Sequence, residues 1–259
     1  MKAGPLFQKL LRIGQQTQDA QLPDPPRPDV NLYVVGDVHG RFDLLTSLMK
    51  KIDIDKSEQS TNDAAVVFVG DLIDRGGQSA EVLKLVREYI RSDVRNACVM
   101  GNHERMMLDF LDRPKENAPW LTFGGAETLA SFGLDTSENA VDLSTVRDEF
   151  RRAMPDGLEN WLRGLPLIWQ NGNVAVVHGA ADPNRAIDAQ TERILLWGNA
   201  SFNRASRQDG IWVAHGHTIV DPPYFGNGRI SVDTGAYLGG PLTAAAVSSQ
   251  GQVRFLSVR

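Results

Sequence analysis

The stretch NLYVVGDVHG at residues 31–40 decides the fold of this chain. Its first half is a short, continuous apolar run, which is typical of a strand buried on both faces of a sheet. Its second half brings glycine, aspartate and histidine directly after that strand. The runs AAVVFV at 64–69, ACVM at 97–100 and VAVV at 174–177 are of the same kind. We therefore predict four buried strands, each followed by glycine and polar residues.

Helical patterns separate the first three of these runs. Apolar residues recur at helical spacing within residues 42–52 and 79–90. This alternation of strand and helix predicts a βαβαβ opening with parallel strands. Residues 103–165 are also mainly helical in pattern, with a turn at Gly124 and Gly125.

From residue 211 onward the pattern changes to short strands separated by glycine, proline and asparagine. We expect strands at 211–214, 229–232, 242–247 and 253–256. Their spacing favours an antiparallel meander that forms or completes a second sheet. The predicted fold is therefore α/β, with two packed β-sheets.

The composition is that of a globular protein. Among 259 residues there are 27 lysines and arginines against 32 aspartates and glutamates, a formal net charge of −5. This acidic balance leaves no basic footprint, so we expect no nucleic-acid partner. The single cysteine, Cys98, excludes an internal disulfide framework and a thiolate metal cluster. No apolar run approaches the roughly 18 residues of a membrane span, so we expect no integral membrane association and a cytoplasmic location.

Residues 1–29 differ from the rest of the chain. Residues 1–13 alternate basic and apolar side chains, which predicts a short amphipathic helix without a secretory signal. This helix would pack on the body or lie at a membrane surface. The following residues are polar and carry four prolines between Pro23 and Pro28, as in an extended linker. We expect a short helix and linker at 1–29 and one folded domain at 30–259.

All five histidines follow a predicted strand within a few residues. The carboxyl ends of strands in an α/β sheet meet at one crevice, where ligands bind. The segment after the second strand adds two carboxylates and a guanidinium. The side chains expected at this edge are Asp37, His39, Asp71, Asp74, Arg75, Asn102, His103, His178, His215 and His217.

Each of these residues alone has an ordinary explanation, such as a helix cap, a turn or a hydrogen-bonded core histidine. Together they favour a metal site, because burying Asp37, Asp71 and Asp74 in one crevice is costly unless cations balance them. Oxygen and imidazole ligands without thiolate suit Mn²⁺, Fe or Zn²⁺. The candidate ligands exceed what one tetrahedral ion needs, so we expect two ions, which activate a bridging water for in-line displacement at phosphorus.

Five motifs in this order resemble the metallophosphoesterase signature. They are GDVHG at 36–40, GDLIDRG at 70–76, GNHE at 101–104, VHG at 177–179 and GHT at 216–218. The Asp-Arg-Gly ending of the second motif is similar to the PPP-type serine/threonine protein phosphatases. The bacterial and phage branch, which also holds symmetrical dinucleoside-tetraphosphate hydrolases, is the nearest likeness. The resemblance implies an α/β/β/α sandwich of two mixed sheets flanked by helices, with the catalytic domain at 30–259.

The resemblance also implies a role for each matching residue. Asp37 and His39 resemble ligands of a first metal, and Asp71 resembles the carboxylate that bridges both metals. The second metal would be bound by Asn102, His178 and His217. His103 matches a general acid that protonates the leaving alkoxide, Asp74 its orienting partner, and Arg75 the guanidinium that binds phosphate oxygens. The implied cofactors are two divalent cations, with manganese as the first choice and iron or zinc as alternatives.

Two positions depart from the pattern of this branch. Asn199 stands where the branch often has an arginine that forms a second phosphate clamp, unless Arg193, Arg204 or Arg207 replaces that charge. His215 lies two residues before His217 on an expected strand, hence on the same face. It would contact a metal or its surroundings, or be a variable neighbour.

The predicted activity is hydrolysis of phosphomonoesters by in-line attack of a hydroxide that bridges the metals. Our first choice of substrate is phosphoserine and phosphothreonine in proteins, with small phosphoesters as further substrates. The alternative is symmetrical hydrolysis of dinucleoside tetraphosphates. That alternative predicts a basic, aromatic nucleotide pocket, for which the sequence offers Arg105, Arg113, Trp120 and Arg151. A non-hydrolytic regulator on the same scaffold is a third hypothesis, which depends on Asn199.

Overall fold

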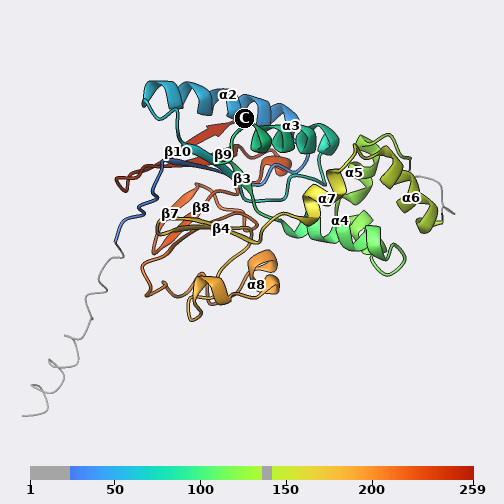
Figure 1. The fold of residues 1–259 in the computed structure, drawn as a ribbon. Helices are drawn as coiled ribbons and strands as arrows, with labels where there is room; N and C mark the ends of the chain where they lie inside the picture. The colour runs from blue at the N-terminus through green and yellow to red at the C-terminus, as the bar shows by residue number, and fades with distance from the viewer. Residues whose placement is uncertain (1–23, 136–141) are drawn as a thin grey trace, which may run out of the picture.

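The computed structural model describes residues 24–135 and 142–259. In this part of the chain two five-stranded sheets pack face to face between layers of helices (Figure 1). The first sheet has the strand order β10–β9–β1–β2–β3. Its strands are β1 (Leu32–Val35), β2 (Ala65–Phe68), β3 (Ala97–Cys98), β9 (Leu242–Val247) and β10 (Val253–Val258).

The second sheet has the strand order β4–β5–β6–β8–β7. Both sheets are mixed, since each contains parallel and antiparallel pairs. The structure therefore confirms the predicted α/β class with two mixed sheets flanked by helices. The strands of this sheet are β4 (Ile168–Asn171), β5 (Val174–Val177), β6 (Trp212–His215), β7 (Tyr224–Gly226) and β8 (Arg229–Ser231).

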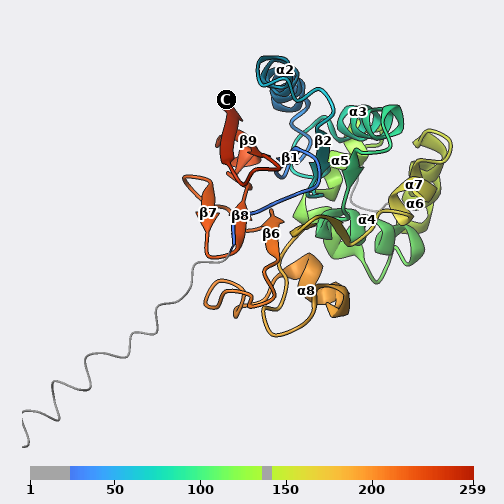
Figure 2. The same ribbon diagram turned by 60° about the vertical axis from the view of Figure 1, so that its left-hand side comes forward.

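Helices cover the outer faces of both sheets. α2 (Phe42–Glu58) and α3 (Ser79–Ser92) lie over the first sheet, and α8 (Glu192–Trp197) lies beyond the second. Figure 2 shows the same layers from another side, with α8 again across the sheets from α2. The helices between β3 and β4 gather at one end of the sheets. They are α4 (Asn102–Asp112), the 3-10 helix at Ala118–Phe123, α5 (Gly125–Ser131), α6 (Leu143–Ala153) and α7 (Leu158–Arg163).

Strand β1 is buried on both faces, as its apolar run predicts. Leu32 and Val34 belong to the core between the two sheets, whereas Tyr33 and Val35 belong to the core beneath the helices. This division follows from the alternation of side chains along a strand. Burial of each large apolar side chain contributes about 1.5–3 kcal/mol, so β1 stabilises both layers of the molecule.

The predicted antiparallel meander at residues 211–256 is wrong. β6 pairs in parallel with both β5 and β8, and β7 pairs antiparallel with β8. β9 and β10 form a hairpin that joins the first sheet, with β9 antiparallel to β1. The spacing of strands shows where the chain turns, but burial decides which strands pair. Every residue of β9 is buried, so this strand lies inside a sheet, between β1 and β10.

The predicted N-terminal helix at 1–13 lies outside the described residues. Of the predicted linker, residues 24–29 lie along the second sheet. The backbone N–H of Asp29 donates to Asn171 at 2.6 Å, and Trp212 Nε1 donates to the carbonyl of Asp24 at 2.6 Å. The helices in the described part of the chain are all too short or too polar to cross a membrane.

Candidate metal centre

The loops after β1, β2, β3, β5 and β6 meet at one edge of the two sheets. The backbone N–H groups of Val38 and His39 both donate to the carbonyl of Asp71, which joins the first two loops. The N–H of His103 donates to Asp71 Oδ1 at 3.0 Å, and that of Gly216 donates to the carbonyl of His178 at 2.9 Å. The carboxyl ends of these parallel strands therefore form the crevice that the sequence predicts.

Several of these loops hold their side chains on a left-handed backbone. A positive φ is uncommon outside glycine and costs about 1–3 kcal/mol at a site such as this. The resulting sharp turns bring side chains from different loops into the crevice. The residues concerned are His39 (φ 45°), Asp71 (φ 48°), Asp74 (φ 72°), Arg75 (φ 70°) and His217 (φ 63°).

Two glycines allow the carboxylates to approach the backbone. A Cβ atom at Gly101 would lie 2.2 Å from Asp71 Oδ1, and one at Gly216 would lie 1.9 Å from Asp37 Oδ1. Both distances are far shorter than any nonbonded contact, so a side chain at either position would displace a carboxylate. This is the physical reason for glycine in the GNHE and GHT motifs.

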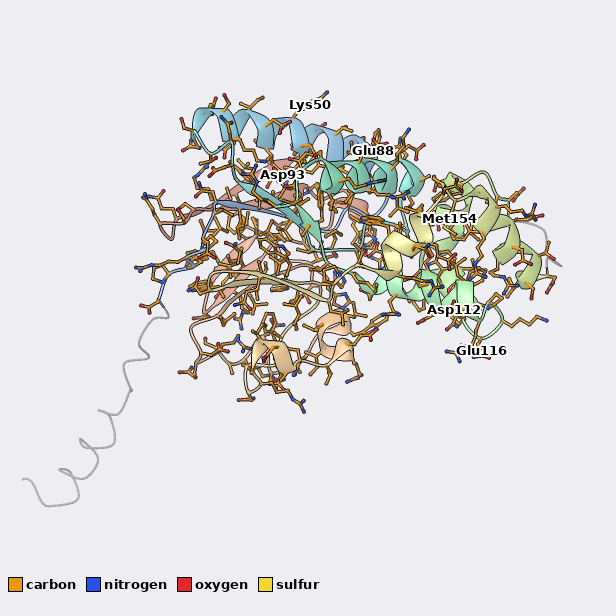
Figure 3. All side chains as sticks on the ribbon, viewed as in Figure 1. Lys50, Glu88, Asp93, Asp112, Glu116 and Met154 are labelled. Atoms are coloured by element: carbon orange, nitrogen blue, oxygen red, sulfur yellow. The ribbon has the colours of Figure 1, made fainter. Side chains whose placement is uncertain are left out.

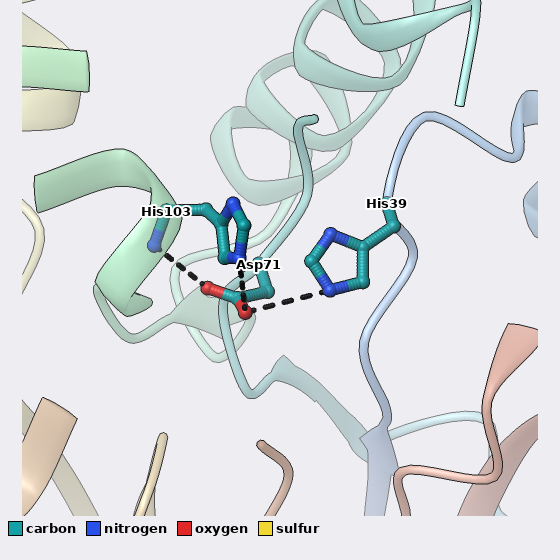
Figure 4. A group of neighbouring side chains, drawn as sticks. All are labelled: His39, Asp71 and His103. Atoms are coloured by element: carbon teal, nitrogen blue, oxygen red, sulfur yellow. Dashed lines mark hydrogen bonds and ion pairs between the residues drawn. The ribbon is translucent and has the colours of Figure 1, made fainter. Parts of the chain in front are cut away.

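Asp71 lies at the centre of the crevice and is 2% exposed. Its Oδ2 atom is 3.5 Å from His39 Nε2 and 3.9 Å from His103 Nε2, while its Oδ1 atom is 3.3 Å from His178 Nε2. Figure 4 shows His39 and His103 on opposite sides of this carboxylate. Asp71 therefore belongs to two groups of closely spaced donor atoms, one with His39 and His103 and one with His178 and His217.

Asn102 completes the second group. Its Oδ1 atom lies 2.7 Å from His178 Nε2 and 2.9 Å from His217 Nδ1. Asp37 lies beside this group, because its Oδ2 atom accepts the backbone N–H of His217 at 3.0 Å. The structure thus brings all six predicted ligands to one crevice.

The tautomers of two histidines suit a cation. His39 Nδ1 lies 2.8 Å from the carbonyl of Ile73, and His178 Nδ1 lies 2.9 Å from the carbonyl of Val69. A carbonyl only accepts, so each Nδ1 carries a proton, and Nε2 is the nitrogen that would bind a cation in place of its own proton. Metal-binding histidines are oriented in this way.

The electrostatics of the crevice also favour positive charge. Burial raises the pKa of Asp37 well above its usual value, and neighbouring Asp233 raises it further. Burial alone would lower the pKa of His178, but Asp71 and Asp37 outweigh it and raise that pKa to about 10. The crevice therefore stabilises an added proton or a cation at this place. A donor set of carboxylates, imidazoles and one amide fits divalent ions such as Mn²⁺, Fe²⁺ or Zn²⁺.

A second cluster adjoins the donor groups. His103 Nδ1 lies 2.6 Å from Asp74 Oδ2, and Arg75 Nη2 donates to His103 Nε2 at 3.2 Å. Burial alone would lower the pKa of His103, but Asp71 and Asp74 together raise it. The three residues that the sequence assigns to proton transfer and phosphate binding are therefore in mutual contact.

Four residues support the site in ways that were not predicted from the sequence. Thr128 Oγ1 and Trp120 Nε1 donate to the two carboxylate oxygens of Asp74 at 2.6 and 2.8 Å. The guanidinium carbon of Arg75 lies 4.1 Å from the ring centre of Tyr237, a cation–π contact. Glu104 accepts the N–H groups of Asp71, Leu72 and Gly101 at 2.8–2.9 Å. Glu104 had a signal in the sequence as the last letter of GNHE, and Trp120 and Thr128 lie in segments that also resemble the family branch, whereas Tyr237 had none.

The nucleotide pocket expected from the sequence is only partly correct. Trp120 is 2% exposed and packs in the core, where it borders only a small cavity of about 110 Å³. Arg113 forms an ion pair with Glu116, and Arg151 pairs with Glu159 and Asp112. Figure 3 labels Asp112 and Glu116 together on the outer side of the helices. Of the four expected residues, only Arg105 lines a cavity near the crevice.

The two departures from the family pattern have structural explanations. Asn199 Oδ1 accepts the N–H and the hydroxyl of Ser201, at 2.9 and 2.7 Å, which fixes the loop after α8. Arg207 is buried against Asp209, and Arg204 is exposed. Of these three arginines, Arg193 alone lines the cavity beside the crevice.

The expectation that His215 shares a face with His217 is wrong. β6 ends at His215, and the positive φ of His217 breaks the alternation of side chains. His215 Nε2 instead accepts the hydroxyl of Ser231 at 2.8 Å, and its Nδ1 donates to the carbonyl of Gly216. His215 is therefore outside both donor groups.

Residues 30–235 match the calcineurin-like phosphoesterase family. The chain therefore belongs to this family of metallophosphoesterases, hydrolases that act on phosphoester bonds with divalent metal ions.

Among its relatives is the asymmetrical bis(5'-nucleosyl)-tetraphosphatase PrpE of Oceanobacillus iheyensis. The two are 29% identical over 234 residues, which covers 83% of this chain and 88% of the relative. The fold is similar to a crystal structure described as a candidate diadenosine tetraphosphatase, with a TM-score of 0.61, 20% identity and coverage of 92% and 99%. It is also similar to a protein serine/threonine phosphatase of Saccharomyces cerevisiae, with a TM-score of 0.57, 16% identity and coverage of 90% and 80%.

Proposed function

We propose that this protein hydrolyses dinucleoside tetraphosphates. The observation that carries the proposal is the contact of His103, Asp74 and Arg75 beside two groups of metal-binding atoms that share Asp71. The name of the Oceanobacillus relative supplies the substrate class. This reading replaces protein phosphatase activity, the first choice from the sequence, by its alternative.

The proposed cofactors are two divalent ions, with manganese as the first choice. One ion would be held by Asp37 and His39, the other by Asn102, His178 and His217, and Asp71 would bridge them. Bound ions would supply positive charge to the phosphate oxygens and lower the pKa of a bound water.

The residues of the second cluster would bind the phosphate and deliver the proton. A phosphate oxygen is a stronger acceptor for Arg75 than an imidazole nitrogen is, so substrate binding would draw Arg75 away from His103 Nε2. Asp74 holds the proton of Nδ1, which leaves Nε2 to donate to the departing oxygen. The raised pKa of His103 keeps this second proton available at a higher pH.

The direct test is hydrolysis of diadenosine tetraphosphate with Mn²⁺, with products separated by anion exchange. The family branch predicted from the sequence would give two ADP, whereas asymmetrical cleavage, as in the name of the relative, would give ATP and AMP. Asp71→Asn is the matched control, because it removes the carboxylate that both groups of metal-binding atoms share. Absence of turnover by the unmodified protein would refute the proposal.

Protein phosphatase activity is retained as a second candidate because of the Asp-Arg-Gly motif at residues 74–76. This motif also supports membership of the PPP-type branch. A phosphoserine peptide assayed in parallel separates the two activities. Turnover of the peptide alone would favour the second candidate, and turnover of neither substrate would favour the non-hydrolytic regulator. The cytoplasmic location and the absence of a nucleic-acid partner stay predictions.

A further inference from the structure

A groove of about 660 Å³ lies between α4 and α8, beside the crevice. Its volume is within the range of small-molecule sites, about 300–1,000 Å³. Polar and charged side chains from α4 face charged and aromatic side chains from α8. The lining residues are Arg105, Asp109, Glu192, Arg193, Leu196 and Trp197.

The groove is adjacent to the proposed reaction centre. Its Trp197 ring lies 6.3 Å from the ring of His217 and nearly perpendicular to it, at 88°. On the other side, Arg105 belongs to the first turn of α4, which starts with Asn102 and His103. The groove is therefore lined by the same helix, α4, that carries His103, and by a residue that contacts His217.

Trp197 presents a large aromatic surface in this groove, with 46% of the residue exposed. An indole is apolar over most of its area, and a flat base can stack on its free face. Its contact with His217 fixes one edge of the ring. Trp197 is therefore oriented to receive a planar group rather than to fill the core.

The charged residues of the groove are of the kinds that bind the phosphates and the ribose of a nucleotide. Arg105 and Arg193 offer guanidinium groups, which suit phosphate oxygens. Arg105 Nε is buried and makes no well-aligned hydrogen bond, although Glu192 Oε1 lies 2.8 Å away. The carboxylates of Asp109 and Glu192 are acceptors of the kind that binds ribose hydroxyls.

We propose that this groove binds one nucleoside phosphate end of the substrate, with the base on Trp197 and phosphates on Arg105 and Arg193. The inference rests on the proposed function and adds to it the place where the nucleotide is recognised. It also assigns to Arg193 the phosphate contact that the arginine expected at position 199 would make.

The test compares ATP with tripolyphosphate as inhibitors of p-nitrophenyl phosphate hydrolysis by the Mn²⁺-loaded protein. Trp197→Ala should raise the inhibition constant of ATP about 10-fold, the value expected for loss of one stacked base. The inhibition constant of tripolyphosphate, which has no base, should change less than about 2-fold. Trp197→Phe keeps an aromatic face and should restore most of the affinity for ATP.

Arg193→Ala should raise the inhibition constants of ATP and tripolyphosphate by similar factors, because both inhibitors carry the phosphates that Arg193 would bind. Arg113→Ala is the matched control, since Arg113 is an exposed arginine paired with Glu116 outside the groove, and it should change neither constant. Equal shifts for the two inhibitors in Trp197→Ala, or no shift for ATP, would overturn the inference.

The same variants distinguish this inference from the proposed function. If Trp197 controls ATP affinity but diadenosine tetraphosphate is not hydrolysed, the groove is a nucleotide site and the proposed substrate is wrong. If diadenosine tetraphosphate is hydrolysed and Trp197→Ala has the kcat/KM of the unmodified protein, the groove assignment alone is wrong.

Discussion

His103 Nδ1 lies 2.6 Å from Asp74 Oδ2, in a contact that is shielded from solvent on all sides. Trp120 and Thr128 donate to the same carboxylate, so Asp74 cannot rotate away from the imidazole without losing both bonds. The orientation of His103 therefore depends on a core tryptophan and a helix threonine that are both buried.

Replacing His103 should affect substrates with poor leaving groups most. His103→Asn removes the proton donor, and kcat for phenyl phosphate should fall about 10²–10⁴-fold. The fall should be smaller for p-nitrophenyl phosphate, whose leaving group needs little protonation. Asp74→Asn should show the same dependence on leaving group with a smaller loss. Steady-state kinetics with both esters measure this, and equal losses on both would contradict the role of His103.

Replacing Asp71 should abolish binding of both metal ions. Asp71 is the carboxylate that both donor groups share, so Asp71→Asn removes a charge from each. Metal content after dialysis, measured by inductively coupled plasma mass spectrometry, should fall to the background. Asp148→Asn is the control, because Asp148 is an exposed carboxylate paired with Arg147 and should retain the metal. One ion retained by Asp71→Asn would show that the bridge is wrong.

Glu104 should contribute to stability rather than to chemistry. It is 0% exposed and accepts three backbone N–H groups from two loops. Glu104→Gln replaces an acceptor oxygen by a donor and leaves a buried N–H unpaired, which should lower the free energy of unfolding by about 1–3 kcal/mol. Urea denaturation measures the change. Glu116→Gln, on the surface, should have little effect, and an equal effect would contradict this prediction.

Asp55 should make stability depend on pH far from the metal centre. Hydrogen bonds from Arg254 hold the pKa of this carboxyl below its usual value, and Tyr33 donates a further bond at 2.6 Å. A lowered pKa in the folded state stabilises the protein above the unfolded value of about 4. That contribution is lost as the pH falls through the folded pKa.

Asp55→Asn should therefore lower the free energy of unfolding by about 1 kcal/mol at neutral pH. The difference from the unmodified protein should shrink in acid, where the native carboxyl is itself protonated. Urea unfolding at several pH values measures both. A difference that stays constant down to about pH 3 would contradict a depressed pKa.

Much of the fold could be predicted because burial on two faces leaves a clear pattern. The runs at 31–35, 64–69, 97–100 and 174–177 each contain a strand of the structure. Strand partners could not be predicted from spacing, since β9 pairs with β1, more than 200 residues away in the sequence. Pairing between strands so far apart in the sequence depends on which of their faces are buried. It cannot be predicted from the local pattern of residues in either strand.

The candidate site could be predicted because its residue types are those that bind metal ions and phosphate. Each carboxylate or imidazole alone has an ordinary explanation, but several of them in loops at one edge of a sheet indicate a metal site, so Asp71, His178 and their neighbours were found. Tyr237 and Thr128 were assigned no role, because an aromatic ring or a hydroxyl occurs in many structural settings. Only their contacts with Arg75 and Asp74 show that they support the site.

The positive φ values of His39, Asp71 and Asp74 have a consequence for engineering. Glycine at any of these positions would relax the backbone but delete a functional side chain. Selecting variants for heat resistance alone should therefore favour proteins that are more stable but have lost activity. When turnover is also required in every round of selection, the stabilising substitutions should occur at other positions.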